Sequence, residues 1–157
     1  RLNDRMGEYV ATQLIKSMVK KQIQVVGGNI LVMGLSFKEN CPDIRNTKII
    51  DLIESLKDYD LNLDIYDPWV DPHEVEKEYG LKPIQQLQNN HYDAIVLAIG
   101  HQNFIDLGYE NIRNLGKTEC IIYDLKHIFK STELLPQVFL HLKAHIVRII
   151  TERMIFL

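Results

Sequence analysis

The sequence predicts an α/β fold in which a parallel sheet is covered by helices on both faces. Short segments of uniformly apolar residues alternate along the chain with longer segments whose apolar residues recur at helical spacing. The apolar segments are too uniform for strands with one face in water, and this alternation is typical of a parallel sheet with right-handed crossovers. With 157 residues, the chain is expected to form one compact unit, with or without an appendage.

The first predicted element is a long N-terminal helix. Asn3 or Asp4 is expected to cap this helix. The helix is expected to end in a lysine pair at residues 20–21, before the glycine pair at residues 27–28. Its apolar stripe is formed by Val10, Leu14, Ile15 and Met18.

Four apolar segments predict the strands of the sheet, at residues 30–33, 61–66, 94–99 and 120–123. Three further helices are predicted, at residues 47–59, 72–80 and 109–115. The first of these has one apolar face that would pack on a sheet, formed by Ile49, Ile53 and Leu56. Asp67 is expected to stop the second strand, and Gly80 to end the second helix. The predicted class is therefore a Rossmann-like parallel sheet with helices on both faces, preceded by a long N-terminal helix.

Composition excludes several classes of function. The 18 basic and 21 acidic residues give a net charge of −3, which argues against general attraction to nucleic acid or to anionic membranes. The two cysteines, Cys41 and Cys120, are far apart and lack a CxxC or histidine-rich companion, so neither a disulfide framework nor a metal site is predicted. A reducing cytoplasm is the expected compartment.

The turn at residues 34–47, GLSFKENCPDIRNT, is the most informative segment. It joins a buried strand to a helix N-terminus, where free backbone amides and the helix dipole favour an anion. Lys38 and Arg45 place two cations beside those amides, so a diphosphate is the expected ligand. The GxGxxG fingerprint of dinucleotide binding is absent from this turn, which is therefore expected to complete a site on another domain.

Three other turns would join this one at the carboxyl edge of the sheet, where such folds bind ligands. They are residues 67–70, 100–104 and 124–127. Four turns are thus predicted to share one rim.

Four separated motifs in this order carry a resemblance to a known family. They are GLSFKENCPDIRNTK, YDPW, AIVLAIGHQNF and IIYDLK. Together they resemble the C-terminal, UDP-binding domain of the UDP-glucose/GDP-mannose dehydrogenase family, and NCPDIRNT is most similar to the branch that oxidises UDP-N-acetylhexosamines for bacterial surface polysaccharides. The opening RLNDRMGEYV resembles the tail of that family's central dimerisation helix.

The resemblance implies a division of the chain and roles for single residues. Residues 1–26 would be the end of the dimerisation helix, residues 27–130 the UDP-binding domain and residues 131–157 an atypical tail. Lys38 would contact the nucleotide sugar with Phe37 beside it, and Arg45 would reach NAD. Lys126 would complete the substrate site, although His127 can be aligned in its place.

The family oxidises the sugar C6 alcohol to a carboxylate by two hydride transfers to NAD, through an essential cysteine in a glycine-rich motif. Cys41 lies in ENCPD rather than in such a motif, so a structural role is expected for it and no catalytic residue is assigned. The chain opens with Arg1 rather than Met, which suggests a fragment. NAD would be bound mainly by a missing N-terminal domain, the full enzyme would be a homodimer, and this chain alone is expected to be inactive.

Each of these residues also has a simpler interpretation. Lys38 can be a solvated loop lysine, and Arg45 can pair with Asp43. Asn46 and Thr47 are predicted to be helix N-caps rather than ligands. Asp67 is predicted to terminate a strand, and Trp69 to pack at the rim or at a subunit surface. At the level of function, the alternative is a nucleotide-binding module or gene remnant that keeps the fold without catalysis.

The tail after residue 130 does not resemble the family. Charged and histidine residues interrupt its apolar sequence, so a membrane span is not predicted. It is either an amphipathic helix or a non-native ending, and in the first case the inward residues would be Val138, Leu142, Ile146, Ile149 and Ile150. His141 and His145 have metal-ligand spacing but no third ligand, so solvent exposure is predicted for both.

Overall fold

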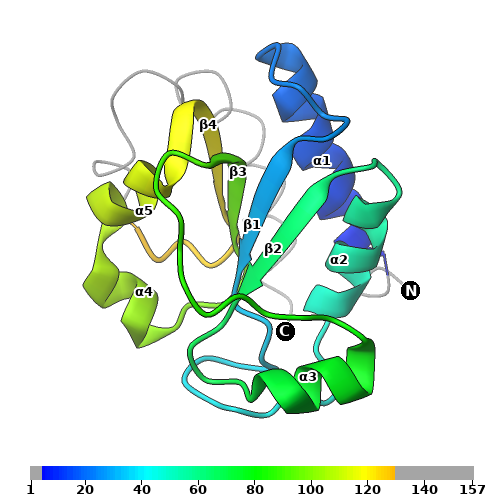
Figure 1. Cartoon of the computed structure of the whole chain (residues 1–157), viewed down its shortest axis with the longest axis vertical. Helices are drawn as coiled ribbons and strands as arrows, with labels where there is room; N and C mark the ends of the chain where they lie inside the picture. Colours follow the sequence, from blue (N-terminus) through cyan, green and yellow to red (C-terminus); the bar gives the residue numbers. More distant parts are fainter. Residues whose placement is uncertain (1–4, 130–157) are drawn as a thin grey trace.

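The computed structural model describes residues 5–129, which form a four-stranded parallel sheet with helices on both faces (Figure 1). The strands are β1 (Asn29–Met33), β2 (Asn62–Tyr66), β3 (Tyr92–Leu97) and β4 (Gly116–Asp124). Their order in the sheet is β2-β1-β3-β4, and every neighbouring pair is parallel. The predicted fold class is confirmed.

The central strand β1 shows why the apolar segments contain so few polar residues. It pairs with β2 on one side and with β3 on the other, and its last four residues are fully buried. Ile30 and Val32 belong to one apolar cluster, whereas Leu31 and Met33 belong to another. Because successive side chains point to opposite faces, a strand covered on both faces must be apolar throughout.

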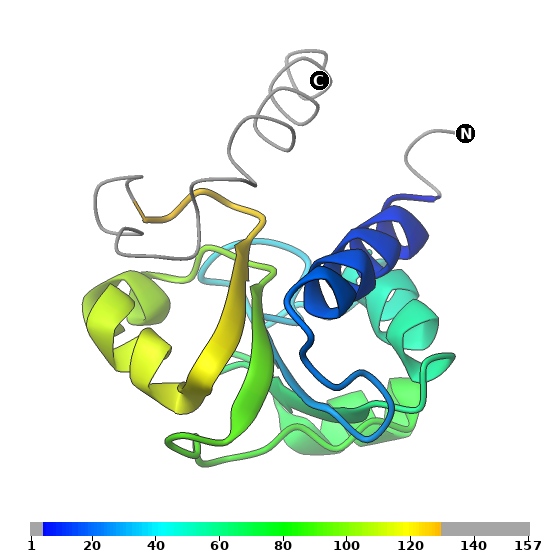
Figure 2. The same cartoon turned by 90° about the horizontal axis from the view of Figure 1, so that it is seen from above.

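Two helices cover the first face, α1 (Met6–Lys20) and α2 (Ile49–Lys57). Figure 2 shows both on the same side of the sheet. They approach closely at Gly7, where a Cβ atom would lie 2.5 Å from the backbone nitrogen of Leu52. The N-cap residue of α1 is Arg5, and the predicted caps Asn3 and Asp4 lie outside the described residues. The predicted stripe is largely confirmed, because Val10, Leu14 and Met18 are buried.

The opposite face is covered by α4 (Gln102–Leu107) and α5 (Tyr109–Leu115) (Figure 2). The bounds of α5 are those predicted, but α4 replaces part of a predicted loop. With only six residues, α4 is too short to establish a helical repeat in the sequence. Phe104 anchors it in the second cluster with only 1% of its surface exposed.

The remaining helix, α3 (Pro72–Tyr79), lies beyond the carboxyl ends of the strands, at the bottom of Figure 1. The Asp71 carboxylate accepts a hydrogen bond from the His73 amide at its start, and Gly80 ends it in the left-handed conformation at φ 65°. The predicted end at Gly80 is confirmed.

Some predicted bounds need correction. The last strand begins at Gly116 rather than at residue 120, and the helix predicted at residues 47–59 spans Ile49–Lys57. Within residues 5–129, none of the helices has both the length and the apolar character needed to cross a bilayer. The alternatives for residues 131–157, and the exposure predicted for His141 and His145, lie outside the described residues.

Candidate functional site

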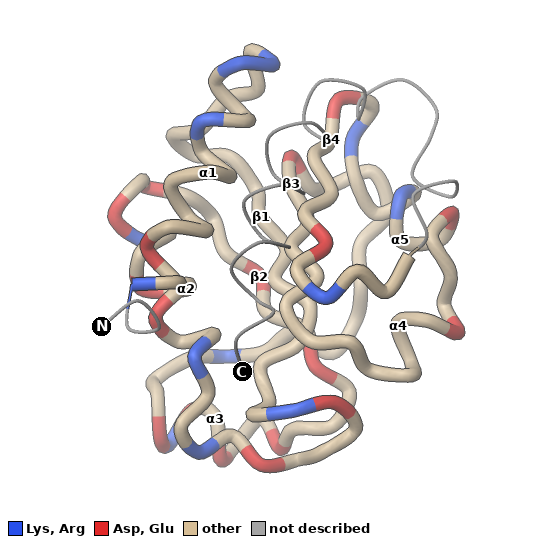
Figure 3. Tube along the Cα trace, turned by 180° about the vertical axis from the view of Figure 1, so that it is seen from behind, with Lys and Arg blue, Asp and Glu red and all other residues tan. Residues whose placement is uncertain are grey.

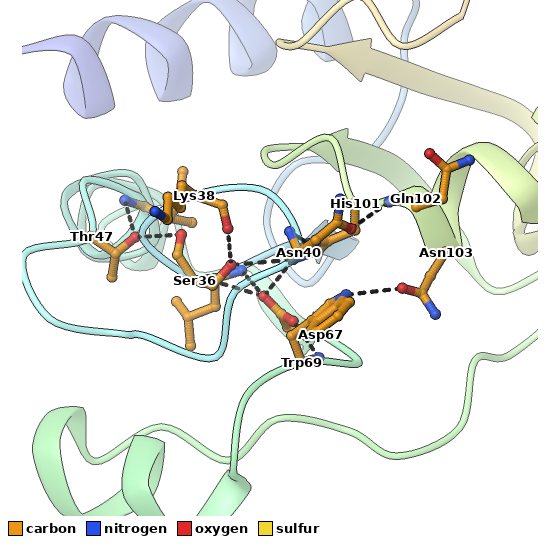
Figure 4. A network of polar contacts seen from close by, with 11 residues as sticks. Ser36, Lys38, Asn40, Thr47, Asp67, Trp69, His101, Gln102 and Asn103 are labelled. Atoms are coloured by element: carbon orange, nitrogen blue, oxygen red, sulfur yellow. Dashed lines mark hydrogen bonds and ion pairs between the residues drawn. The ribbon is translucent and has the colours of Figure 1, made fainter.

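The predicted rim exists at the carboxyl edge of the sheet. Asp67 follows β2, His101 follows β3, and both contact the turn after β1 (Figure 4). The turn after β4 joins them through Lys126, whose Nζ lies 3.2 Å from Oε1 of Glu39. Four segments that are far apart in the sequence therefore meet, as the parallel order of the strands requires.

Gly34 opens the turn after β1, and no other residue fits there. Its φ of +97° is in a region that side chains rarely adopt. An added Cβ atom would also lie 2.5 Å from Cβ of Ile99, the second residue after the end of β3. The turn can therefore start close against β3 only because this position has no side chain.

Asp67 is the hub of the rim. Its Oδ2 accepts hydrogen bonds from the amides of Leu35 at 2.7 Å and Ser36 at 3.0 Å, and its Oδ1 accepts one from the Trp69 amide at 2.8 Å. Burial alone would raise the pKa of Asp67, but the hydrogen bonds from His101 and these amides outweigh it and lower the pKa. Asp67 does terminate its strand as predicted, but it also fixes the neighbouring turn.

These bonds engage amides of a turn that was expected to offer donors to an anion, although the free amides themselves were expected in the first turn of the following helix, where the Ile49 amide donates to Thr47. The amides already engaged are those of Leu35 and Ser36 on Asp67, Phe37 on the Asp43 carbonyl, Asn40 on His101 and Arg45 on the Asp43 carboxylate. The anion held by the first two amides is thus the protein's own carboxylate. These five amides are therefore not available to a ligand phosphate.

His101 is the residue that sequence reasoning missed. It is completely buried, and its Nδ1 accepts a hydrogen bond from the Asn40 amide at 2.9 Å. Since an amide can only donate, Nδ1 carries no proton, and the ring proton must be on Nε2. Nε2 lies 3.0 Å from Oδ2 of Asp67 and 3.2 Å from Oγ of Ser36. His101 is therefore a neutral imidazole that donates to Asp67.

A serine, a histidine and an aspartate in contact invite comparison with a nucleophilic triad, but the geometry excludes that role. In such a triad the aspartate and the serine bind opposite ring nitrogens, so that the ring can take the serine proton. Here both lie at Nε2, which already carries a proton, and the Ser36 hydroxyl donates to the Lys38 carbonyl at 3.0 Å. The cluster is a structural clasp.

The predicted substrate residues Phe37 and Lys38 both lie on the outside of the turn. Phe37 is 56% exposed, and Lys38 is exposed as well. Among residues 5–129, the Lys38 ammonium takes part in no ion pair. Both side chains are therefore available to a ligand at the rim.

Arg45, the predicted cofactor residue, pairs with Asp43, which was the simpler interpretation of its role. Its Nε and Nη2 lie 2.9 and 2.7 Å from the two carboxylate oxygens of Asp43. This bidentate pair lowers the pKa of Asp43 to about 2. The Arg45 side chain is still 80% exposed, so the pair lies in solvent, where such pairs contribute little to stability.

Lys126, the third predicted substrate residue, is close to the same turn. Its ion pair with Glu39 is partly exposed. The pKa of Glu39 is lowered chiefly by a backbone hydrogen bond, against the effect of burial, with Lys126 contributing further. The alternative residue His127 has a left-handed backbone at φ 51°.

The two predicted caps differ. The N-cap of α2 is Lys48, so Thr47 is not the N-cap as predicted. Its hydroxyl nevertheless accepts a hydrogen bond from the Ile49 amide at 3.3 Å and donates to the Ser36 carbonyl at 3.4 Å, and it thus binds the start of the helix. Asn46 has a left-handed backbone at φ 58° and is not the cap.

Trp69 packs at the rim, as predicted. Its ring stacks on His101 with centroids 6.3 Å apart, and its Nε1 donates to Oδ1 of Asn103 at 2.9 Å. Asn40 joins the turn after β1 to the start of α4, because its Oδ1 accepts a hydrogen bond from the Gln102 amide at 2.8 Å. The sequence signal for this network was the polar run HQN at residues 101–103, which begins four positions after the end of the buried strand β3.

Of the two cysteines, only Cys120 is excluded from chemistry at the rim by its surroundings, and the structural role expected of Cys41 stays a prediction. Both are free, and burial raises the pKa of the Cys120 thiol to about 12, so it stays protonated. In the described part of the chain, no three His, Cys, Asp or Glu side chains are grouped to hold a metal ion. Figure 3 shows basic and acidic segments interspersed along this part of the trace, so the cations of the rim act locally.

Comparison with known proteins gives a consistent result. Residues 31–131 match the family model of the UDP-glucose/GDP-mannose dehydrogenase family, UDP binding domain. UDP-N-acetyl-D-glucosamine 6-dehydrogenase of Salmonella typhi is 52% identical over 133 residues, which are 85% of this chain and 31% of that protein. The protein of the same name from Pseudomonas aeruginosa is 49% identical over 82% of this chain and 30% of its own length. The chain thus spans about 30% of the curated relatives it matches.

Solved structures agree on the fold. The structure of UDP-D-ManNAc dehydrogenase from Pyrococcus horikoshii superposes with a TM-score of 0.68 at 26% identity, over 88% of this chain and 30% of that one. NDP-N-acetyl-D-galactosaminuronic acid dehydrogenase from Methanosarcina mazei superposes with a TM-score of 0.71 at 18% identity, over 83% of this chain and 27% of that one. The second likeness is one of fold alone.

Proposed function

The chain belongs to the UDP-glucose/GDP-mannose dehydrogenase family, as its UDP binding domain, and from this premise we propose that it binds the substrate of an NAD-dependent UDP-N-acetylhexosamine 6-dehydrogenase. The substrate class is supported by the 52% and 49% identity to two UDP-N-acetyl-D-glucosamine 6-dehydrogenases. The whole enzyme would form a uronic acid for surface polysaccharide synthesis in the cytoplasm. The free cysteines at positions 41 and 120 are compatible with a reducing compartment.

The single observation that carries this proposal is the presence of exposed cations at the shared rim. Lys38 is exposed, and Lys126 contacts the adjacent residue Glu39, so we assign both ammonium groups to one diphosphate. Phe37 is 56% exposed beside them and offers an aromatic surface to the nucleotide or the sugar. The domain supplies binding and orientation, and no catalytic residue is assigned to it.

Arg45 is the residue that we assign to NAD, the cofactor that accepts the hydride in such enzymes. Its planar fork already holds a carboxylate in the bidentate geometry that also suits a phosphate. Because the pair with Asp43 is exposed, exchanging that partner costs little. Most contacts to NAD would come from another domain, since the turn after β1 lacks the dinucleotide fingerprint.

We assign α1 to the end of a dimerisation helix in the full-length enzyme. Although one side of α1 is buried, Met6 is 45%, Tyr9 37% and Val19 61% exposed. Apolar side chains on the outer side of a helix are suited to a subunit interface. Analytical ultracentrifugation of the full-length enzyme tests this assignment, and a monomer would contradict it.

Calorimetric titration of the chain with UDP tests the substrate site. We expect weak binding, and Lys38→Ala should weaken it about tenfold because it removes a charge that faces the diphosphate. Lys20→Ala is the matched control, since Lys20 is an exposed lysine at the end of α1, away from the rim. Equal effects of the two substitutions would contradict the assignment. Addition of NAD and UDP-N-acetylglucosamine should produce no NADH.

A further inference from the structure

We infer that His101 is a positioning residue, which holds the segment carrying Phe37 and Lys38 in the conformation that meets the ligand. This inference rests on the proposed function for the ligand, but the clasp itself can be tested without one. His101 touches neither the solvent nor, by its complete burial, the ligand. It acts through the residues that it holds.

The arrangement of the contacts carries the inference. His101 lies against Ser36 through Nε2 and against the Asn40 amide through Nδ1. Those two residues flank the exposed residues 37–39, so one imidazole ring fixes both ends of the segment that faces the ligand (Figure 4). The Gln102 amide, which donates to Oδ1 of Asn40, fixes the second end again.

The ring itself is held from several elements. Nε2 donates to Asp67 after β2, the Trp69 ring stacks on one face, and Phe104 of α4 makes an edge contact with centroids 5.2 Å apart. The charged groups that face it are the carboxylate of Asp67 and, farther away, that of Glu39. A ring enclosed in this way cannot reorient, so the segment cannot move independently of the sheet.

Only the neutral tautomer with its proton on Nε2 can accept a hydrogen bond from the Asn40 amide and donate one to Asp67 at the same time. A proton on Nδ1 would face the Asn40 N–H, and two donors would then meet in a buried site. The structure therefore fixes the tautomer as well as the position of the ring. Nitrogen NMR of the imidazole in the wild-type chain should show an unprotonated Nδ1 and a protonated Nε2, and the reverse assignment would overturn the inference.

Two conservative variants separate the two ring nitrogens. The amide oxygen of His101→Asn can occupy the place of Nδ1 and keep the acceptor for Asn40, whereas the amide nitrogen of His101→Gln can occupy the place of Nε2 and keep the donor to Asp67. Without ligand, we expect the Asn40 amide to exchange with solvent faster in His101→Gln, and the amide signals of Phe37 and Lys38 to show increased mobility. His101→Asn should keep both properties closer to wild type.

Titration with UDP then tests the link to the ligand. Affinity should fall about five- to tenfold in His101→Gln and less in His101→Asn, because loss of one buried hydrogen bond loosens the segment. In a Lys38→Ala background the effect of His101→Gln should become small, since the cation to be positioned is gone. If the wild type binds UDP but both variants bind it equally well, the positioning role is wrong. If the wild type binds no UDP, the proposed function fails, and unchanged exchange and mobility in His101→Gln would separately reject the clasp.

Discussion

Each half of the turn after β1 is bound by an aspartate that contacts a basic side chain, and the two pairs differ in almost every physical respect. Asp67 and His101 reach the first half from the turns after β2 and β3, whereas Asp43 and Arg45 belong to the second half. Asp67 and His101 lie 3.0 Å apart with both side chains fully buried. Asp43 and Arg45 lie 2.7 Å apart, with side chains 33% and 80% exposed. The shorter contact is the one that water can replace, so distance alone does not rank the two pairs.

The difference assigns a different task to each half. The buried half fixes the backbone of Leu35 and Ser36, whose amides cannot find another acceptor once the site is dry. The exposed half leaves the side chains of Phe37, Lys38 and Arg45 toward solvent, where a ligand can compete for them. A rigid base with exchangeable outer groups is what a binding turn requires.

The largest effect on stability is expected from Asp67→Asn, which tests whether the buried half of the turn differs from the exposed half. The amide side chain keeps the shape but must turn an NH₂ group toward one of the four donors at Asp67, and it removes the charge that they share. We expect the free energy of unfolding to fall by about 3 kcal/mol. Urea denaturation measures this loss. Asp58→Asn at the exposed end of α2 is the control, and an equal loss in both variants would remove the distinction between buried and exposed carboxylates.

The contrast also explains how far the sequence could predict the molecule. The strands were predictable because β1 and β3 are buried on both faces and contain almost no polar residues. Lys38, Phe37 and Arg45 were recognised in one contiguous motif, and the structure places all three on one turn. His101 is 61 positions from Asn40, so its role depends on the register of β1 against β3, which a single sequence does not reveal.

The local chemistry of the turn was predicted less well for the same reason. An internal carboxylate at residue 67 takes two amides of a turn that was expected to offer its donors to a ligand, and no local pattern links it to residues 35 and 36. The helix α4 was missed because six residues do not establish a period. The sequence therefore pointed to the exposed residues of the candidate site, whose roles stay predictions, whereas the buried half required the fold.

Acid titration gives a second, smaller test of the buried half. Because folding lowers the pKa of Asp67, its ionised form stabilises the fold above the unfolded-state pKa of about 3.9, and this contribution is lost as the pH falls toward the lowered folded-state value. Unfolding free energies measured from about pH 6 down to pH 3 should fall more steeply for the wild type than for Asp67→Asn. Parallel curves would show that protonation of Asp67 does not cause the loss of stability at low pH.

The smallest expected effect, on the exposed half, sharpens the comparison most. Asp43→Asn should leave the urea midpoint unchanged, because its pair with Arg45 is held in solvent. It should also raise the affinity for UDP, by less than about threefold, since a negative charge that acts on Lys38 disappears. The gain in affinity should vanish in about 0.5 M salt, because exposed charges are well screened at that ionic strength. A loss of stability comparable to that of Asp67→Asn, or a gain that persists at high salt, would mean that the outer half of the turn is as fixed as the inner half and is not an exchangeable surface.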